Sequence, residues 1–237
     1  MKLLQTLTNL LETLRSPPER ARVYRDYNRV RQLYIVQATA QHFGMRDDDP
    51  APLFGKTLLD VGCGSSTIGE FLALSGADIT AVDPCTDALA CAQASADAYG
   101  APVTFLESKV ENLLNSLPRY DVILALDLLE ESPDASKMLW VLRQLLRPEG
   151  VIVFSLITRT PKAWLVHKFL SQYVYRRVKN NRRYSQFFQP YQLADLAVQQ
   201  GLVVTNIQGL KFSLTTQTWR LKATPDTRYM AMATLKP

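Results

Sequence analysis

Acidic residues are missing from one long stretch of the sequence. Between Gly150 and Ala194 there is no Asp or Glu, whereas eight Lys and Arg fall there. The rest of the chain carries 19 basic and 22 acidic residues, so the net charge of +5 belongs to this one segment. A basic coat for general nucleic-acid binding is therefore excluded, and we expect no nucleic-acid partner.

Cysteine and long apolar runs are also scarce. The cysteines, Cys63, Cys85 and Cys91, are odd in number and form no Cys-x-x-Cys motif, which is typical of small buried side chains in a reducing compartment. Apolar runs reach about five residues, far short of the roughly 20 that a membrane-spanning helix needs. Polar residues interrupt the leucines of the first 16 positions, so we expect no secretory signal and a cytoplasmic location.

What is present is an ordinary globular composition, with 47% hydrophobic and 21% charged residues. This balance excludes a disordered or collagen-like chain. Leucine spacing predicts a helix before Ser16, and the prolines at positions 17 and 18 predict the start of a second helix that runs to about His42. We expect N-terminal helices and a linker over residues 1–55, followed by one domain over residues 56–237.

From Lys56 onward, short apolar runs alternate with helical stretches. The predicted strands are Thr57–Val61, Asp78–Val82, Val103–Leu106, Asp121–Leu126 and Val151–Ser155, and the predicted helices are Ser66–Leu74, Thr86–Tyr99, Lys109–Leu117 and Ala135–Leu146. Continuous apolar strands that are each followed by a helix indicate a parallel sheet covered on both faces. The predicted fold class is therefore α/β, a doubly wound, mostly parallel, Rossmann-like sheet.

The regular alternation ends near residue 157. A helical insertion is expected over about 157–189, before a helix near Gln192–Gln200 and closing strands at Leu202–Ile207 and Tyr229–Thr234.

A glycine-containing turn follows the first predicted strand. The run Asp60-Val61-Gly62-Cys63-Gly64 places two glycines one residue apart, just before a predicted helix. Gly62 allows a tight turn, and Gly64 leaves the backbone open to a ligand because it lacks a Cβ. The second predicted strand is followed by Asp83, a position where a carboxylate can hydrogen-bond ribose hydroxyls. Together these features predict a nucleoside-binding site.

Two classes of cofactor use this arrangement. A dinucleotide needs a third glycine so that its pyrophosphate can rest on the helix N-terminus, and Thr67 stands at that position. S-adenosylmethionine has no phosphate and needs no third glycine. The turn therefore predicts a methyltransferase that uses S-adenosylmethionine.

Several longer segments are shared with one family of such enzymes. They include Asn28–Ile35, the Asp60–Ser66 loop, Arg159–Leu165, Phe187–Pro190 and the Tyr229-Met230 tail. On these residues the chain, from about Tyr27 to Pro237, resembles the 3-demethylubiquinol 3-O-methyltransferase family of ubiquinone biosynthesis, as a diverged member. The resemblance implies an O-methyltransferase that acts on a phenolic hydroxyl of a polyprenylated quinol intermediate.

The resemblance also implies roles for individual residues. Arg31 would contact the methionine carboxylate of the cofactor, a group that a planar cation suits. Gly62 would approach the methionine moiety, Asp83 would hold the ribose and Leu126 would line the site.

Family members carry an acid and then a Glu-His pair after the fourth strand, taken to hold Mg²⁺ near the substrate phenol. Here these residues are Asp127, Glu130 and Glu131, so a glutamate replaces the histidine. Their i, i+3, i+4 spacing predicts that the three carboxylates share one helical face, where they either hold Mg²⁺ or remain solvated acids at a helix start. The phenol, with a pKa of about 10, must lose its proton. Glu130, Glu131 or a bound ion are the candidates for removing it.

The substrate side departs further from the family. Asn180-Asn181-Arg182 replaces a usual Gly-Thr-His, and Lys211-Phe212-Ser213-Leu214 replaces a His-Tyr-Asn-Pro. Neither His42 nor His167 occupies a family position. Two alternatives therefore stay open beside the quinol enzyme: a methyltransferase for another phenol or small molecule, and a non-catalytic methyltransferase fold that acts as a membrane scaffold.

The basic segment interleaves cations with apolar side chains. Positions 166, 169, 170, 173 and 174 form one apolar stripe, which predicts a helix. A basic amphipathic helix with aromatic residues is typical of a membrane interface. Because a long-tailed quinol lies in the bilayer, we expect peripheral contact with the inner membrane through about residues 162–184, and the resemblance allows a place in a quinone-biosynthesis complex. A lid packed on the domain is the alternative, whereas an RNA-binding patch lacks a recognisable module.

Overall fold

The computed structural model describes residues 17–46, 49–65, 68–115, 118–173, 183–213 and 215–236. The helix predicted before Ser16 lies outside these residues. So does the 174–182 part of the insertion, with four of its eight cations: Arg176, Arg177, Lys179 and Arg182.

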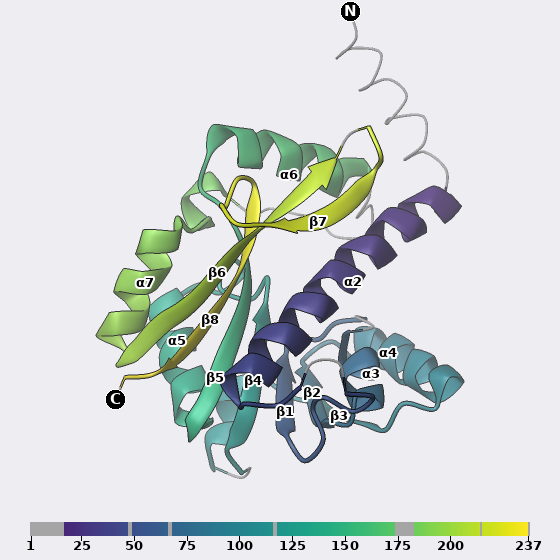
Figure 1. The fold of residues 1–237 in the computed structure, drawn as a ribbon, viewed down its shortest axis with the longest axis vertical. Coiled ribbons are helices and arrows are strands. Elements are labelled where there is room, and N and C mark those ends of the chain that lie inside the picture. The colour runs from purple at the N-terminus through teal and green to yellow at the C-terminus, as the bar shows by residue number, and fades with distance from the viewer. Residues whose placement is uncertain are drawn as a thin grey trace, which may run out of the picture.

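Eight strands of the described residues form one sheet, in the order β3-β2-β1-β4-β5-β8-β6-β7 (Figure 1). Their bounds are β1 Thr57–Val61, β2 Asp78–Asp83, β3 Val103–Glu107, β4 Tyr120–Leu126, β5 Leu146–Ile157, β6 Leu202–Ser213, β7 Thr218–Lys222 and β8 Arg228–Leu235. The first five strands pair in parallel, whereas β8, β6 and β7 are joined antiparallel to β5 and to one another. The predicted α/β class with a mostly parallel sheet is confirmed.

Helices cover both faces of this sheet. They are α2 Pro17–His42, α3 Ile68–Leu74, α4 Thr86–Tyr99, α5 Ala135–Gln144, α6 Pro161–Tyr173 and α7 Pro190–Gln199, with short 3₁₀ helices at Val110–Asn115 and Tyr184–Gln186. Successive strand residues face opposite sides, so Leu58 belongs to a core that includes Tyr27 and Tyr34 of α2, whereas Leu59 belongs to a core under α5 and α7. The long helix α2 thus shares a hydrophobic core with the sheet.

The carboxyl ends of β1, β2 and β4 meet at one edge of the sheet, because these neighbouring strands run in parallel. Helix α6 follows β5 at this edge, and Figure 1 shows it across the end of the β6–β7 hairpin. The helix expected in the insertion is therefore present, over its described part. No helix among the described residues has both the length and the apolar character needed to cross a membrane.

Three strands differ from the sequence expectation by more than one residue. β6 continues to Ser213 rather than ending at Ile207. β5 begins at Leu146 rather than Val151, with a register shift opposite Tyr120 and Val122. β7 was not expected, because its sequence Thr-Trp-Arg-Leu-Lys lacks the continuous apolar run that marks the predicted strands. Its Trp219 is buried against the core, and pairing with β6 completes the hairpin.

Candidate functional site

The turn after β1 adopts a backbone that glycine permits. Gly62 and Gly64 have φ angles of +67° and +55°, in the left-handed region that residues with a Cβ rarely enter. The amides of Gly62 and Cys63 donate to the Val82 carbonyl at 2.8 and 3.3 Å, which ties the turn to β2. A Cβ added to Gly64 would meet no atom within 4 Å. The backbone at Gly64 is therefore open to the approach of a ligand.

Asp83 fixes the other side of this opening. One oxygen of its carboxylate accepts the Gly64 amide at 2.9 Å, and the other accepts the Cys85 amide at 2.8 Å. The same side chain thereby holds the glycine turn and the residue that precedes α4. Each carboxylate oxygen has a second lone pair, so Asp83 can still accept hydrogen bonds from hydroxyl groups of a ligand.

A buried cluster of charge lies at the same edge, where α2 crosses it. Arg31 donates to Asp127 Oδ2 at 2.9 Å and to Asn28 Oδ1 at 2.7 Å, with its guanidinium 4.3 Å from the centre of the Tyr27 ring. Arg228 donates to the other Asp127 oxygen at 2.8 Å and to the Tyr27 hydroxyl at 2.6 Å. One carboxylate thus links two arginines from opposite ends of the chain. Two cations on one anion leave positive charge available for a carboxylate of a ligand.

Asp60 connects this cluster to the glycine turn. It is 3% exposed, and burial raises the pKa of its carboxyl to about 7, with Arg31 lowering the pKa and Asp83 raising it. The pKa of Asp60 thus responds to the charges of both Arg31 and Asp83. Leu126 lies half-buried at the end of β4, packed against the core under α2. The structure therefore brings the five predicted cofactor residues to one edge of the sheet.

The prediction that three carboxylates share a helical face after β4 is wrong. Asp127 has a φ of +59° and the following residues form a turn, so that the next helix, α5, begins only at Ala135. A left-handed residue at one end and Pro133 at the other leave no room for a helix. No group of three potential ligands in the described part of the chain is placed to hold a metal ion.

The separate surroundings of the three acids explain this result. Asp127 is held by its two arginines. Glu130 is fully buried, accepts the Ile157 amide at 2.7 Å and raises the pKa of the Tyr229 hydroxyl beyond the effect of burial. Glu131 is exposed. These residues do not fit the expected Mg²⁺ site, and Glu130 acts instead as an acceptor that joins the turn to β5.

Sequence reasoning missed the partners of Arg31. Asn28 and Arg31 occur in one recognised segment, but nothing there indicated that two guanidinium groups lie over the Tyr27 ring. In the sequence, Arg228 is marked only by its place directly before the Tyr229-Met230 tail. Arg228 also links the cluster to α6, because its Nη2 lies 3.5 Å from Nδ1 of His167.

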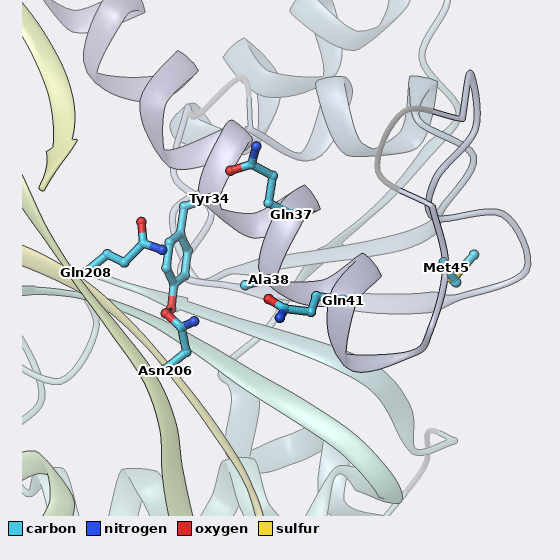
Figure 2. A pocket seen from close by; sticks show the side chains of 7 residues that line it. All are labelled: Tyr34, Gln37, Ala38, Gln41, Met45, Asn206 and Gln208. Atoms are coloured by element: carbon cyan, nitrogen blue, oxygen red, sulfur yellow. Dashed lines mark hydrogen bonds between the residues drawn. The ribbon is translucent and has the colours of Figure 1, made fainter. Parts of the chain in front are cut away.

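A cavity of about 410 Å³ lies between α2 and β6 (Figure 2). Carboxamides line it, and the Tyr34 hydroxyl donates to Asn206 Oδ1 at 3.0 Å. Burial raises the pKa of Tyr34, so this phenol stays protonated. The cavity extends to Gln41 and Met45, near the end of α2 where His42 contacts the Glu149 carbonyl. It therefore lies toward the amino ends of the parallel strands, away from the glycine turn.

The chain is similar in sequence to known methyltransferases. Residues 59–152 match the family model described as a methyltransferase domain. The ubiquinone biosynthesis O-methyltransferase of Photorhabdus laumondii is 33% identical over 180 residues, which cover 75% of each chain. The enzyme of the same name from Azorhizobium caulinodans is 30% identical over 85% of this chain and 80% of its own. The chain belongs to the ubiquinone biosynthesis O-methyltransferase family.

Solved structures agree on the fold. The magnesium protoporphyrin IX methyltransferase of Synechocystis with bound SAH is similar over 97% of this chain and 99% of its own, with a TM-score of 0.63 at 19% identity. The plantazolicin methyltransferase BamL gives a TM-score of 0.64 at 15% identity, over 98% of this chain and 97% of its own. The sequence resemblance is confirmed, and so is the enzyme class: this family member is an S-adenosylmethionine-dependent methyltransferase.

Proposed function

We propose that this family member transfers the methyl group of S-adenosylmethionine to a phenolic hydroxyl of a polyprenylated quinol intermediate in ubiquinone biosynthesis. Membership of the family supports the choice of acceptor. One structural observation supports S-adenosylmethionine as the methyl donor: Arg31, Gly64 and Asp83 are arranged around one opening.

Each of these groups suits one part of the donor. The positive cluster of Arg31 and Arg228 receives the methionine carboxylate, the open backbone at Gly64 lets the nucleoside approach, and Asp83 accepts the ribose hydroxyls. When bound, the donor supplies a sulfonium, which is already a good leaving group. The enzyme therefore contributes mainly alignment of the acceptor oxygen with the methyl carbon.

Removal of the phenol proton falls to the segment after β4. Glu130 is fully buried and already accepts the Ile157 amide, so its role is to hold this turn in place. Glu131, exposed on the same turn, can exchange protons with solvent and is the proposed base. With this role, Glu131→Gln lowers the rate on a phenol most at neutral pH and least at high pH, where the phenol ionises by itself.

The acceptor is tested by transfer of radiolabelled methyl groups across a panel of phenols that includes a demethylated quinol. Preference for the quinol supports the proposal. The replaced segment 211–214 favours a second candidate, a methyltransferase for another phenol, and this enzyme would label a different member of the panel and leave the quinol unlabelled.

The proposed route to a bilayer-embedded acceptor is peripheral contact through α6. One side of this helix packs on the domain, with Ala163 and His167 1% and 5% exposed. Leu165 is 65% exposed, and Lys162 and Lys168 are exposed near it. An apolar side chain between cations suits an anionic membrane surface. A lid packed only on the domain would bury Leu165 instead.

A further inference from the structure

Another cavity lies between α6 and the β6–β7 hairpin. Its volume is about 420 Å³, and no residue of the glycine turn or the Arg31 cluster lines it. Its wall includes Lys211, Phe212 and Ser213 of β6. The cavity thus lies outside the methyl-donor site.

The charges around this cavity do not balance. Among the residues that the structure describes, three cations line it, Lys162, Lys211 and Arg220, against one acid, Asp226. Asp226 is already engaged, because Lys162 Nζ lies 2.6 Å from its Oδ2. Within the described residues, Lys211 and Arg220 form no ion pair. The cavity therefore presents two uncompensated positive charges.

These two cations also stand directly opposite each other. Lys211 on β6 and Arg220 on β7 are partners in the antiparallel register. Like charges at opposed positions of neighbouring strands destabilise a hairpin. An anion placed between them would remove this repulsion and gain two charge-assisted hydrogen bonds.

The rest of the cavity wall consists of hydroxyl groups and apolar side chains. Ser213 and Thr215 supply hydroxyl groups whose oxygens lie 3.1 Å apart and share one hydrogen bond, so one of the two hydroxyls remains a donor for a ligand. Val166 and Phe212 supply an apolar surface. A ligand that satisfies all these groups has several anionic oxygens at one end and an apolar body at the other.

We propose that this cavity binds the phosphate group of an ester that carries an apolar chain. A guanidinium fork and an ammonium both suit phosphate oxygens, and a phosphate has a further oxygen that can accept the remaining hydroxyl donor of Ser213 and Thr215. The site does not depend on the identity of the methyl acceptor. Its ligand class is shared by bilayer lipids and by free amphiphiles.

The probe is octyl phosphate below its micelle concentration, titrated into the full chain by calorimetry. Lys211→Gln with Arg220→Gln is expected to weaken binding by about tenfold or more, because two hydrogen bonds to a charged group are lost. Lys222→Gln is the matched control, an exposed cation on β7 that does not line the cavity. It leaves the affinity unchanged. Equal affinity of the double variant and the parent, or equal binding of uncharged octyl glucoside, overturns the proposal.

Vesicles containing phosphatidic acid identify the source of the phosphate. Loss of vesicle binding in the double variant assigns the site to a lipid headgroup. Retained vesicle binding, together with lost octyl phosphate binding, assigns it to a free amphiphile.

Thermal unfolding gives an independent readout. Arg220→Glu replaces the repulsive pair with an attractive one, so it raises the Tm without ligand and removes the increase in Tm that octyl phosphate causes. A variant that still responds to octyl phosphate like the parent contradicts the assignment.

Discussion

The charges of this enzyme fall into two regions that differ in how they are satisfied. At the carboxyl edge of β1 and β4, the side chains of Arg31 and Arg228 are 5% and 7% exposed, and both bind Asp127. Around α6 and the hairpin, the side chain of Lys162 is 63% exposed in its ion pair with Asp226, and Lys211 and Arg220 face each other. Buried charges fix one geometry and are costly to remove singly, whereas exposed charges contribute little stability and stay available to ligands.

The largest expected effect follows from removal of a buried charge. Arg31→Ala removes a buried guanidinium that donates to both Asp127 and Asn28, and it leaves the buried Asn28 Oδ1 without this donor. It should lower the free energy of unfolding by about 3–5 kcal/mol, measured by urea denaturation. Arg29→Ala, an exposed arginine of the same helix, is the control and should change it by less than about 0.5 kcal/mol. Equal effects of the two substitutions would remove the distinction between the regions.

A smaller effect is expected where one carboxylate orders the cofactor opening. Asp83→Asn loses the charge that accepts the Gly64 and Cys85 amides. Binding of S-adenosylhomocysteine should weaken about 10- to 100-fold, measured by calorimetry. Asp87→Asn, an exposed acid in the first turn of α4, should bind as the parent does. If Asp83→Asn also binds normally, the cofactor does not use this opening.

Asp60 gives the buried region a dependence on pH. Its pKa is raised from 3.8 to about 7, so between these values the folded state binds more protons than the unfolded state. The free energy of unfolding therefore falls as the pH rises from about 4 to 7, by up to about 1 kcal/mol per pH unit, and is level above that. Asp60→Asn should flatten this decline. Urea denaturation at pH 5 and pH 8 measures it, and the same decline in both proteins would contradict the burial of an ionisable group here.

The smallest effect on stability is expected in the exposed region. Leu165→Asp should change the free energy of unfolding by less than about 0.5 kcal/mol, yet reduce flotation with anionic liposomes. Leu33→Asp, at a 48% exposed leucine of α2, is the control and should float as the parent does. Unchanged flotation of Leu165→Asp, or flotation that is indifferent to salt, would favour the packed lid.

Local signals predicted the elements that have marked ends. Helix α4 runs from Thr86 to Tyr99 as expected, because Pro84 precedes it and Gly100 caps it in the left-handed conformation. The bounds of β1 were also correct. These elements position the glycine turn and Asp83, so half of the candidate site could be read from the sequence.

The other half depends on topology. Asp127 meets Arg31 and Arg228 from 96 and 101 positions away, and no local pattern indicates such pairs. The same ion pairs explain why the spacing of the three carboxylates gave a wrong prediction. Acids at i, i+3 and i+4 share a face only if a helix forms. Asp127 instead binds two arginines, and no helix forms after it. Pairing of β7 with β6 likewise depends on a hairpin that aligns Trp219 with the core under α2.

The central claim is methyl transfer to a quinol from a donor held by Arg31 and Asp83. Its most direct test is transfer of a radiolabelled methyl group from S-adenosylmethionine to a demethylated quinol, by the parent enzyme and by Asp83→Ala. The parent enzyme is expected to label the quinol. Asp83→Ala is expected to lose this labelling, and an excess of S-adenosylmethionine should partly restore it. An unlabelled quinol in the presence of measured donor binding, or equal labelling by both proteins, would contradict the account.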